Sequence, residues 1–374
     1  MDLTAQHPTD GRRYQPFDGL RAILVMGVMA HHVEWTLGDT TPIFEAGWLP
    51  VDGFFVLSGF LISTALLREF ANTGTIDIVN FLGRRFARLY PALLVVLGVI
   101  GVVGVVADGR PFADVWPSLA SAASLGHNFN YRSVSPLLTE VGPLWSLGIE
   151  FQFYIVFPVI ALALLALRAP RRVWVVLLLA AMAASATGRA MLGVERFPES
   201  YLWTPVRMDS LLGGVLLALA RQWGWLDVIK PAAARAVAVI STGTLMALYL
   251  TLDGFDARTY DWGITLASLA STGLIGAVLL LPHSRLDALL SWRPLVGLGR
   301  RSYSAYLWHQ AVFLFLMRHT DRGPWSRPVV GFVATFVLAD LTYRLVERPV
   351  LAWSGRSLRT GRTAIVRTRL AELD

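Results

Sequence analysis

The chain has 374 residues, of which 55% are hydrophobic and 16% are charged, whereas a soluble domain usually carries about 25% charged residues. It contains no cysteine, which excludes structural disulfides, thiolate metal sites and a cysteine-bound acyl intermediate. The net charge is +7, and because apolar runs long enough to cross a membrane recur along the chain, we attribute this excess to membrane orientation rather than nucleic-acid binding.

The apolar runs are continuous rather than alternating, which favours helices over a barrel of strands. We therefore expect an all-α integral membrane protein, a polytopic bundle of about ten transmembrane helices with no soluble domain. The predicted spans are 20–37, 50–67, 90–107, 144–166, 172–189, 202–220, 233–252, 262–281, 301–317 and 327–346. They divide the chain into a cytoplasmic N-terminal segment (1–19), a transmembrane domain (20–349) and a basic cytoplasmic tail (350–374).

Basic residues are distributed unevenly between the two sides of this predicted bundle. With the N-terminus in the cytoplasm, roughly three quarters of the 33 Lys and Arg residues fall on the cytoplasmic side. The positive-inside rule then places both termini in the cytoplasm. No small-residue cleavage site follows the first apolar run, so we expect no cleavable signal peptide.

The first predicted helix carries two ionisable side chains on one face. Arg21 and His32 are eleven residues apart, which at 100° per residue is about 1100°, roughly 20° past three full turns. Their axial separation of about 16 Å places Arg21 near the cytoplasmic surface and His32 near the midplane or beyond it, while His31 points about 100° away. The alternative is that Arg21 snorkels and His32 is a core histidine with its hydrogen bonds satisfied.

The second predicted helix contains the motif VDGFFVLSGFLIS. Gly53 and Gly59 permit close approach of a neighbouring backbone. Ser58 lies between them and is a nucleophile in principle, but a hydroxyl that packs between helices is the interpretation we favour.

Three arginines precede the third predicted span, in FLGRRFARLYP. Arg84 and Arg88 are four residues apart, and Arg85 and Arg88 three, so on a helix they converge on one patch. Guanidinium forks match phosphate groups bidentately, which predicts a phosphate site. A positive-inside anchor is the alternative, and it is the usual role of a basic loop.

Glu150 lies near the outer start of the fourth predicted span, in GPLWSLGIEFQFY. It is about 9 Å inside the membrane, a depth that His32 can reach from the opposite end. A carboxylate at this depth needs a partner, and a His32–Glu150 pair is the simplest one and also orients a general base. The alternative partners are the hydroxyls of Ser146 and Tyr154.

Further polar candidates lie in the later helices. Arg207 and Asp209, in VRMDSLLGG, are expected to form an intramembrane charge pair. Tyr306 and His309 belong to a polar stripe along SYSAYLWHQ, and Glu347 stands at the cytoplasmic exit of the last helix. Because ionisable groups within a span cost roughly 2.5–3.5 kcal/mol each, we treat them as functional candidates.

The chain resembles the bacterial acyltransferase family 3, which includes membrane O-acyltransferases of O-antigens and macrolides. Seven motifs carry the resemblance and occur in the family's order. They are FDGLRAILVMGVMAHH, VDGFFVLSGFLIS, RRFARLYP, LWSLGIEFQFY, VRMDSLLGG, GRRSYSAYLWH and YRLVERP. The family often has an appended periplasmic hydrolase-like domain, which we expect to be absent because the chain ends soon after the last predicted span.

The resemblance implies roles for the arginines. The family's pattern of two arginines separated by two residues falls on Arg85 and Arg88, which are expected to hold the phosphates of acyl-CoA with help from Arg84. Arg21 is the arginine of the family's Arg-x10-His pattern and is expected to guide the pantetheine arm or a phosphate.

The resemblance also implies the catalytic residues. His32 is expected to act as general base toward the acceptor hydroxyl, oriented by Glu150, and an acyl-histidine relay is the variant. The family usually has two adjacent acids in the helix 4 motif, but here the second position is Phe151, so only Glu150 can be assigned. No metal is required.

The implied reaction moves an acyl group, usually acetyl, from cytoplasmic acyl-CoA to a hydroxyl of a glycan, lipid-linked saccharide or glycosylated secondary metabolite. The implied location is the bacterial cytoplasmic membrane. The acceptor, the acyl chain length and the oligomeric state are not specified by the sequence. The alternative is a transporter or flippase that uses the intramembrane charges as a proton relay, but it predicts inverted repeats that the sequence does not contain.

Overall fold

The computed structural model describes residues 14–37, 46–131, 138–321, 323 and 326–353, and no strand occurs among them. The α-helices are α1 (Gln15–Leu37), α2 (Leu49–Thr73), α3 (Ile78–Val102), α4 (Phe112–Ala123), α5 (His127–Asn130), α6 (Trp145–Ala166), α7 (Arg171–Leu192), α8 (Glu199–Leu202), α9 (Met208–Gln222), α10 (Pro231–Thr251), α11 (Ile264–Leu280), α12 (Arg285–Leu290), α13 (Arg293–Gly299), α14 (Ser302–His319) and α15 (Ser326–Thr342). Short π-helical turns are at Val103–Ala107, Thr259–Gly263 and Tyr343–Glu347, and 3-10 turns at Thr139–Leu144, Val194–Arg196 and Thr204–Val206.

The expectation of a helical multi-pass membrane protein is confirmed. Within the described ranges, seven helical stretches are long and apolar enough to cross a membrane. They are Leu49–Thr73, Ile78–Ala107, Thr139–Ala166, Arg171–Leu192, Pro231–Thr251, Thr259–Leu280 and Ser326–Trp353. Each contains or overlaps one of the ten predicted spans.

The count of about ten spans is not confirmed, because three predicted spans fall on helices that do not meet these criteria. The span predicted at 202–220 is interrupted near Pro205, and α9 begins only at Met208, so its 15 residues extend about 22 Å. The other two helices, α1 and α14, carry the ionisable and hydroxyl side chains of the candidate site, which lower their hydropathy.

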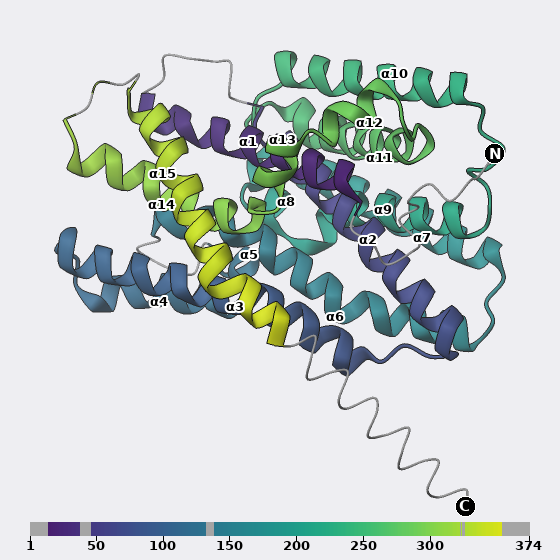
Figure 1. The fold of residues 1–374 in the computed structure, drawn as a ribbon, viewed down its shortest axis with the longest axis horizontal. Helices are drawn as coiled ribbons and strands as arrows, with labels where there is room; N and C mark the ends of the chain where they lie inside the picture. The colour runs from purple at the N-terminus through teal and green to yellow at the C-terminus, as the bar shows by residue number, and fades with distance from the viewer. Residues whose placement is uncertain (1–13, 38–45, 132–137, 322, 324–325, 354–374) are drawn as a thin grey trace, which may run out of the picture.

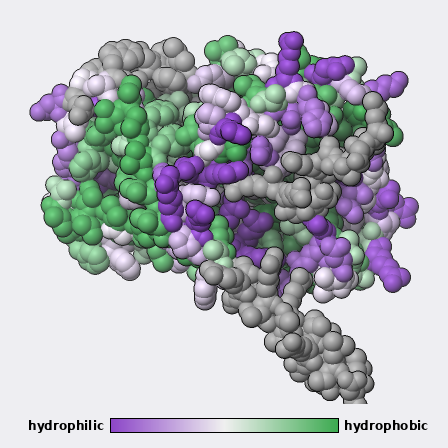
Figure 2. Space-filling view, in the orientation of Figure 1, coloured by the Kyte–Doolittle hydropathy of each residue, from purple (hydrophilic) through white to green (hydrophobic). Residues whose placement is uncertain are grey.

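The outer surface shows where lipid would lie. Val95, Val99, Val102 and Val106 are exposed and recur every three or four residues along α3 and its π-helical extension. Other exposed apolar side chains occur along α10 and α15. Figure 2 shows hydrophobic side chains gathered on the left of the face drawn there. Apolar surface of this extent is typical of contact with a bilayer.

Helix α2 is the centre of the packing and runs diagonally through the bundle beside α9 (Figure 1). Two glycines allow this contact. A Cβ added at Gly59 would collide with the carbonyl oxygen of Leu211, and one added at Gly214 would collide with that of Val56. The two backbones can therefore approach only because neither position carries a side chain. The close contact fixes the position of α2 in the bundle, and with it the direction in which Ser58 points.

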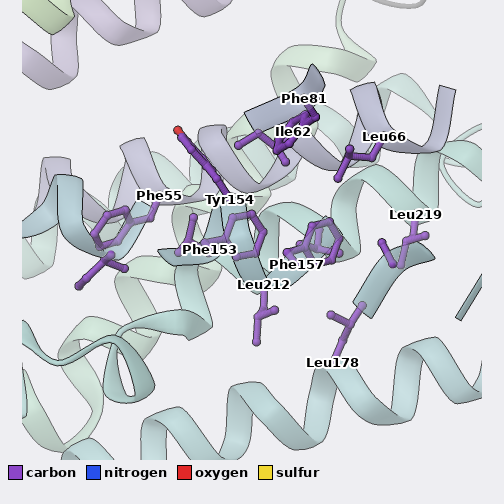
Figure 3. Close-up of a cluster of buried hydrophobic side chains, with 14 of the residues drawn as sticks. Phe55, Ile62, Leu66, Phe81, Phe153, Tyr154, Phe157, Leu178, Leu212 and Leu219 are labelled. Atoms are coloured by element: carbon purple, nitrogen blue, oxygen red, sulfur yellow. The ribbon is translucent and has the colours of Figure 1, made fainter. Parts of the chain in front are cut away.

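An aromatic core lies between α2, α3 and α6. Phe153 and Phe157 of α6 stack with ring centroids 4.8 Å apart. The ring of Tyr154 packs edge-on to Phe81 of α3, with 6.4 Å between centroids. Figure 3 shows the Tyr154 hydroxyl pointing away from Phe153 and Phe157. The core thus holds α6 so that the Tyr154 hydroxyl is directed out of the apolar cluster.

Candidate active site

One cavity is lined by side chains of α1, α2, α3, α6 and α14, and its empty space, open mouth included, is about 840 Å³. Its polar lining residues are Arg21, Ser58, Arg85, Arg88, Ser146, Glu150, Tyr154, Ser302, Tyr303 and Tyr306. The cavity brings together cations, one carboxylate and several hydroxyls from segments far apart in the sequence.

Glu150 lies in the second turn of α6 and has two hydroxyl partners. The Oγ of Ser58 donates a hydrogen bond to Glu150 Oε1. The hydroxyl of Tyr154 donates to Oε2 over 3.1 Å. The predicted His32–Glu150 pair is therefore wrong, and of the two alternative partners Tyr154 is the one observed. The two donors fix the orientation of the carboxylate.

The arginines of α3 divide between two environments. Arg85 and Arg88 line the cavity, and the Arg85 guanidinium lies 5.6 Å from the centroid of the Tyr154 ring. Arg84 does not line it among the described residues, and instead pairs with Glu69 at 3.5 Å with 45% of its side chain exposed. The predicted three-arginine patch is thus reduced to two in the cavity lining, because Glu69 holds Arg84 outside it.

Arg21 also reaches the cavity, and a buried carboxylate holds it. Its Nη1 lies 3.2 Å from Oδ1 of Asp18, which is fully buried, and Arg300 approaches Oδ2 of the same residue at 3.7 Å. A Cβ added at Gly299 would collide with the carbonyl oxygen of Asp18, so α13 packs directly on this turn of α1. Asp18 was not among the predicted site residues, although its position three residues before Arg21 is a signal for such a pair.

His32 lies beside His309 rather than beside Glu150. Nε2 of the fully buried His309 is 3.3 Å from Nδ1 of His32, and the two ring centroids are 4.8 Å apart. Nδ1 of His32 also lies 2.9 Å from the carbonyl oxygen of Val28. Nδ1 of His309 lies 2.6 Å from the carbonyl oxygen of Tyr306. Because carbonyls only accept, both rings carry their proton on Nδ1 when neutral.

Neither His32 nor His309 is among the described residues that line the cavity. Tyr306 connects the two places, since it lines the cavity and its ring centroid is 5.5 Å from that of His309. The Tyr306 hydroxyl donates to the carbonyl oxygen of Pro143 and lies 2.6 Å from Oγ of Ser146. Of the two potential bases, Glu150 therefore lines the cavity, whereas His32 lies with His309 outside its described lining.

The remaining acidic candidates lie outside the cavity lining. Glu347 accepts a hydrogen bond from Ser304. Asp209 is bound by Arg189 at 2.7 Å, while Arg207 pairs with Asp52 at 3.1 Å. The predicted Arg207–Asp209 pair is thus wrong, because each of the two residues pairs with a different buried partner, Arg207 with Asp52 and Asp209 with Arg189. No group of three or more His, Asp or Glu residues in the described part of the chain could hold a metal ion.

Replacing Arg207 with methionine is expected to destabilise the protein by about 3–5 kcal/mol, because it leaves the buried Asp52 carboxylate without its cation. Both side chains of the pair are completely buried, and Arg207 also packs 4.9 Å from the ring centroid of Tyr201. The measurement is thermal unfolding of the purified protein in detergent. Arg258→Met is the control, since that arginine is exposed and pairs with Asp256 on the surface. Equal melting temperatures for the two variants and the wild type would contradict a structural role for the buried pair.

The chain is similar to known acyltransferases. A family model described as an acyltransferase domain matches residues 15–344. The chain is 29% identical over 364 residues to the O-acetyltransferase OatA of Staphylococcus aureus strain NCTC 8325 / PS 47, and OatA of strain COL matches equally. These matches cover 90% of this chain but only 57% of the length of each relative. No solved structure matches the chain.

Proposed function

The chain belongs to acyltransferase family 3, whose domain model matches nearly all of it, and on this basis we propose that it is a membrane O-acyltransferase. The donor is acyl-CoA, with acetyl as the first acyl group to test, because the relatives are named O-acetyltransferases. The acceptor is a hydroxyl of a glycan, lipid-linked saccharide or glycosylated metabolite. The observation that carries the proposal is one cavity that joins Arg21, Arg85 and Arg88 to Glu150.

The arginines supply the donor site in this proposal. A CoA molecule carries three phosphates, and guanidinium groups bind phosphate oxygens bidentately. Arg85 is held in place by its contacts with the rings of Phe81 and Tyr154, and Arg21 by Asp18. Preorganised cations of this kind bind an anionic ligand without first losing side-chain freedom.

Two bases serve the chemistry. Glu150 stands in the cavity, where the thioester would lie. His32, which lies beside His309, acts on the acceptor hydroxyl. In its neutral form His32 carries its proton on Nδ1, so Nε2 is the nitrogen that takes up a proton. His309, rather than Glu150, orients this imidazole.

The same residues support a proposal for the orientation in the membrane. Arg85 and Arg88 lie in the first three turns of α3, which begins at Ile78, before the predicted span at 90–107. We place this end, and both chain termini, in the cytoplasm, where acyl-CoA is made. The bacterial cytoplasmic membrane is the proposed location.

Arg88 variants test the donor site. Arg88→Ala is expected to raise the KM for acetyl-CoA by about tenfold or more, since a hydrogen bond to a charged group contributes about 1.5–3 kcal/mol. Arg88→Lys is expected to be impaired as well, because an ammonium cannot form the bidentate contact. Arg84→Ala is the matched control, since Arg84 pairs with Glu69 outside the cavity lining.

The outcome separates three roles for Arg88. If Arg88→Lys has wild-type kinetics and Arg88→Ala is inactive, only the positive charge of Arg88 is required. A lower kcat with an unchanged KM would indicate that Arg88 contacts the thioester carbonyl rather than the phosphates. Full activity of both variants would remove Arg88 from the donor site.

A further inference from the structure

We propose that Ser58 is a catalytic residue that accepts the acyl group from CoA before the acceptor does. This proposal rests on the proposed function, because it requires an acyl-CoA in the cavity. It predicts a covalent acyl-serine intermediate and double-displacement kinetics in place of direct transfer.

The contacts of Ser58 form the arrangement of an activated nucleophile. Its hydroxyl donates to Oε1 of Glu150, the one carboxylate among the described lining residues of the cavity. Oε2 of Glu150 accepts from the hydroxyl of the buried Tyr154 at 3.1 Å. A nucleophile that touches a base, which is in turn oriented by a third group, is the geometry required for covalent catalysis.

Packing alone does not account for this hydrogen bond. Hydroxyls within membrane helices commonly bond to the carbonyl oxygen four residues earlier on the same helix. Thr64 of α2 does so, with its Oγ1 2.7 Å from the carbonyl oxygen of Phe60. Ser58, on the same helix, instead donates to a carboxylate 92 residues away and remains partly exposed in the cavity.

The position of Ser58 is fixed by the helix that carries it. Gly59, the next residue, lies against the backbone of Leu211, so this turn of α2 cannot shift without a collision. One and a half turns earlier, Asp52 is anchored by Arg207 and by Ser210, whose Oγ lies 2.6 Å from Oδ1. A catalytic group on a rigid element keeps the geometry that reaction requires.

The two half-reactions balance. In the first, Ser58 Oγ attacks the thioester carbon, its proton passes to Glu150, the carbon–sulfur bond breaks, and Glu150 returns the proton to the CoA thiolate. In the second, the acceptor oxygen attacks the acyl-serine and its proton passes to His32. The bond from Oγ to the acyl carbon breaks, Oγ takes up a proton from water by way of Glu150, and His32 releases the acceptor's proton to water.

The test uses the full chain in lipid vesicles with acetyl-labelled acetyl-CoA and no acceptor. We expect label that survives denaturation and maps to the Ser58 peptide, together with exchange of label between acetyl-CoA and free CoA. Ser58→Ala should lose both. Ser63→Ala is the control, since Ser63 is buried on the same helix and is not among the described cavity residues. Ser58→Cys should gain a thioester that neutral hydroxylamine cleaves, and its assignment is unambiguous because the chain has no other cysteine.

Each other outcome overturns the proposal. Label on His32 instead of Ser58 would establish an acyl-histidine relay. Transfer to an acceptor by Ser58→Ala at the wild-type rate would show direct transfer, while the proposed acyltransferase function stands. If the wild type neither binds nor consumes acetyl-CoA, both the intermediate and the donor assignment fail.

Discussion

Replacing Glu150 with glutamine is expected to lower acyl transfer by about 10²–10⁴-fold, the usual contribution of a general base. Glutamine has nearly the same shape, and its amide oxygen can still accept a hydrogen bond from one of the two partners of Glu150, Ser58 and Tyr154, while its NH2 group donates to the other hydroxyl. It cannot take up a proton, so the chemistry is lost while the packing of α6 is kept. The measurement is single-turnover release of CoA from acetyl-CoA, with thermal unfolding recorded alongside.

Glu69→Gln is the control for Glu150→Gln, because Glu69 pairs with Arg84 and is not among the described residues of the cavity. It should release CoA at the wild-type rate. Equal turnover by Glu150→Gln would show that the carboxylate only organises the hydroxyls around it.

His32→Ala is expected to lower transfer to the acceptor by a similar factor of about 10²–10⁴, because it removes the second base. The arginines are untouched, so the variant should still bind CoA, and it should still exchange label between acetyl-CoA and CoA. His31→Ala is the matched control, since it removes the neighbouring imidazole, whose ring centroid lies 5.0 Å from that of His32, and keeps the His32–His309 contact. The measurement is transfer of labelled acetyl to the acceptor beside CoA binding.

A packing role for His32 gives the opposite result. His32 stacks edge-on against the buried His309, so a purely structural histidine would show lost thermal stability with activity per folded molecule intact. Normal turnover by folded His32→Ala would remove it from the mechanism and leave Glu150 as the base for both half-reactions.

Periodicity and composition predict much of this architecture. Continuous apolar runs identified the helices, and seven of the ten predicted spans meet the length and hydropathy of a membrane helix. The other three do not meet these criteria, because α1 and α14 carry polar side chains and α9, which begins after the buried Arg207, has only 15 residues. The polar candidate residues thus lower the average hydropathy of the helices that carry them.

The candidate site was predicted residue by residue but not pair by pair. Arg21, Arg85, Arg88 and Glu150 meet in one cavity, although their roles stay predictions. Helical spacing shows which residues share a face of one helix, but it does not show which neighbour that face meets. For this reason Glu150 was expected beside His32, whereas the structure places it beside Ser58 and Tyr154.

The central claim is that acyl-CoA binds in the cavity between α2, α3 and α6, and cysteine protection tests it most directly. The chain contains no cysteine, so Leu61→Cys places a single thiol in the cavity lining. Ala71→Cys, on the same helix and not among the described lining residues, is the control. A membrane-impermeant thiol reagent and acetyl-CoA are added to the face of the vesicles that corresponds to the cytoplasm. We predict that acetyl-CoA slows modification at residue 61 and not at residue 71, whereas equal rates at residue 61 with and without acetyl-CoA would contradict the account.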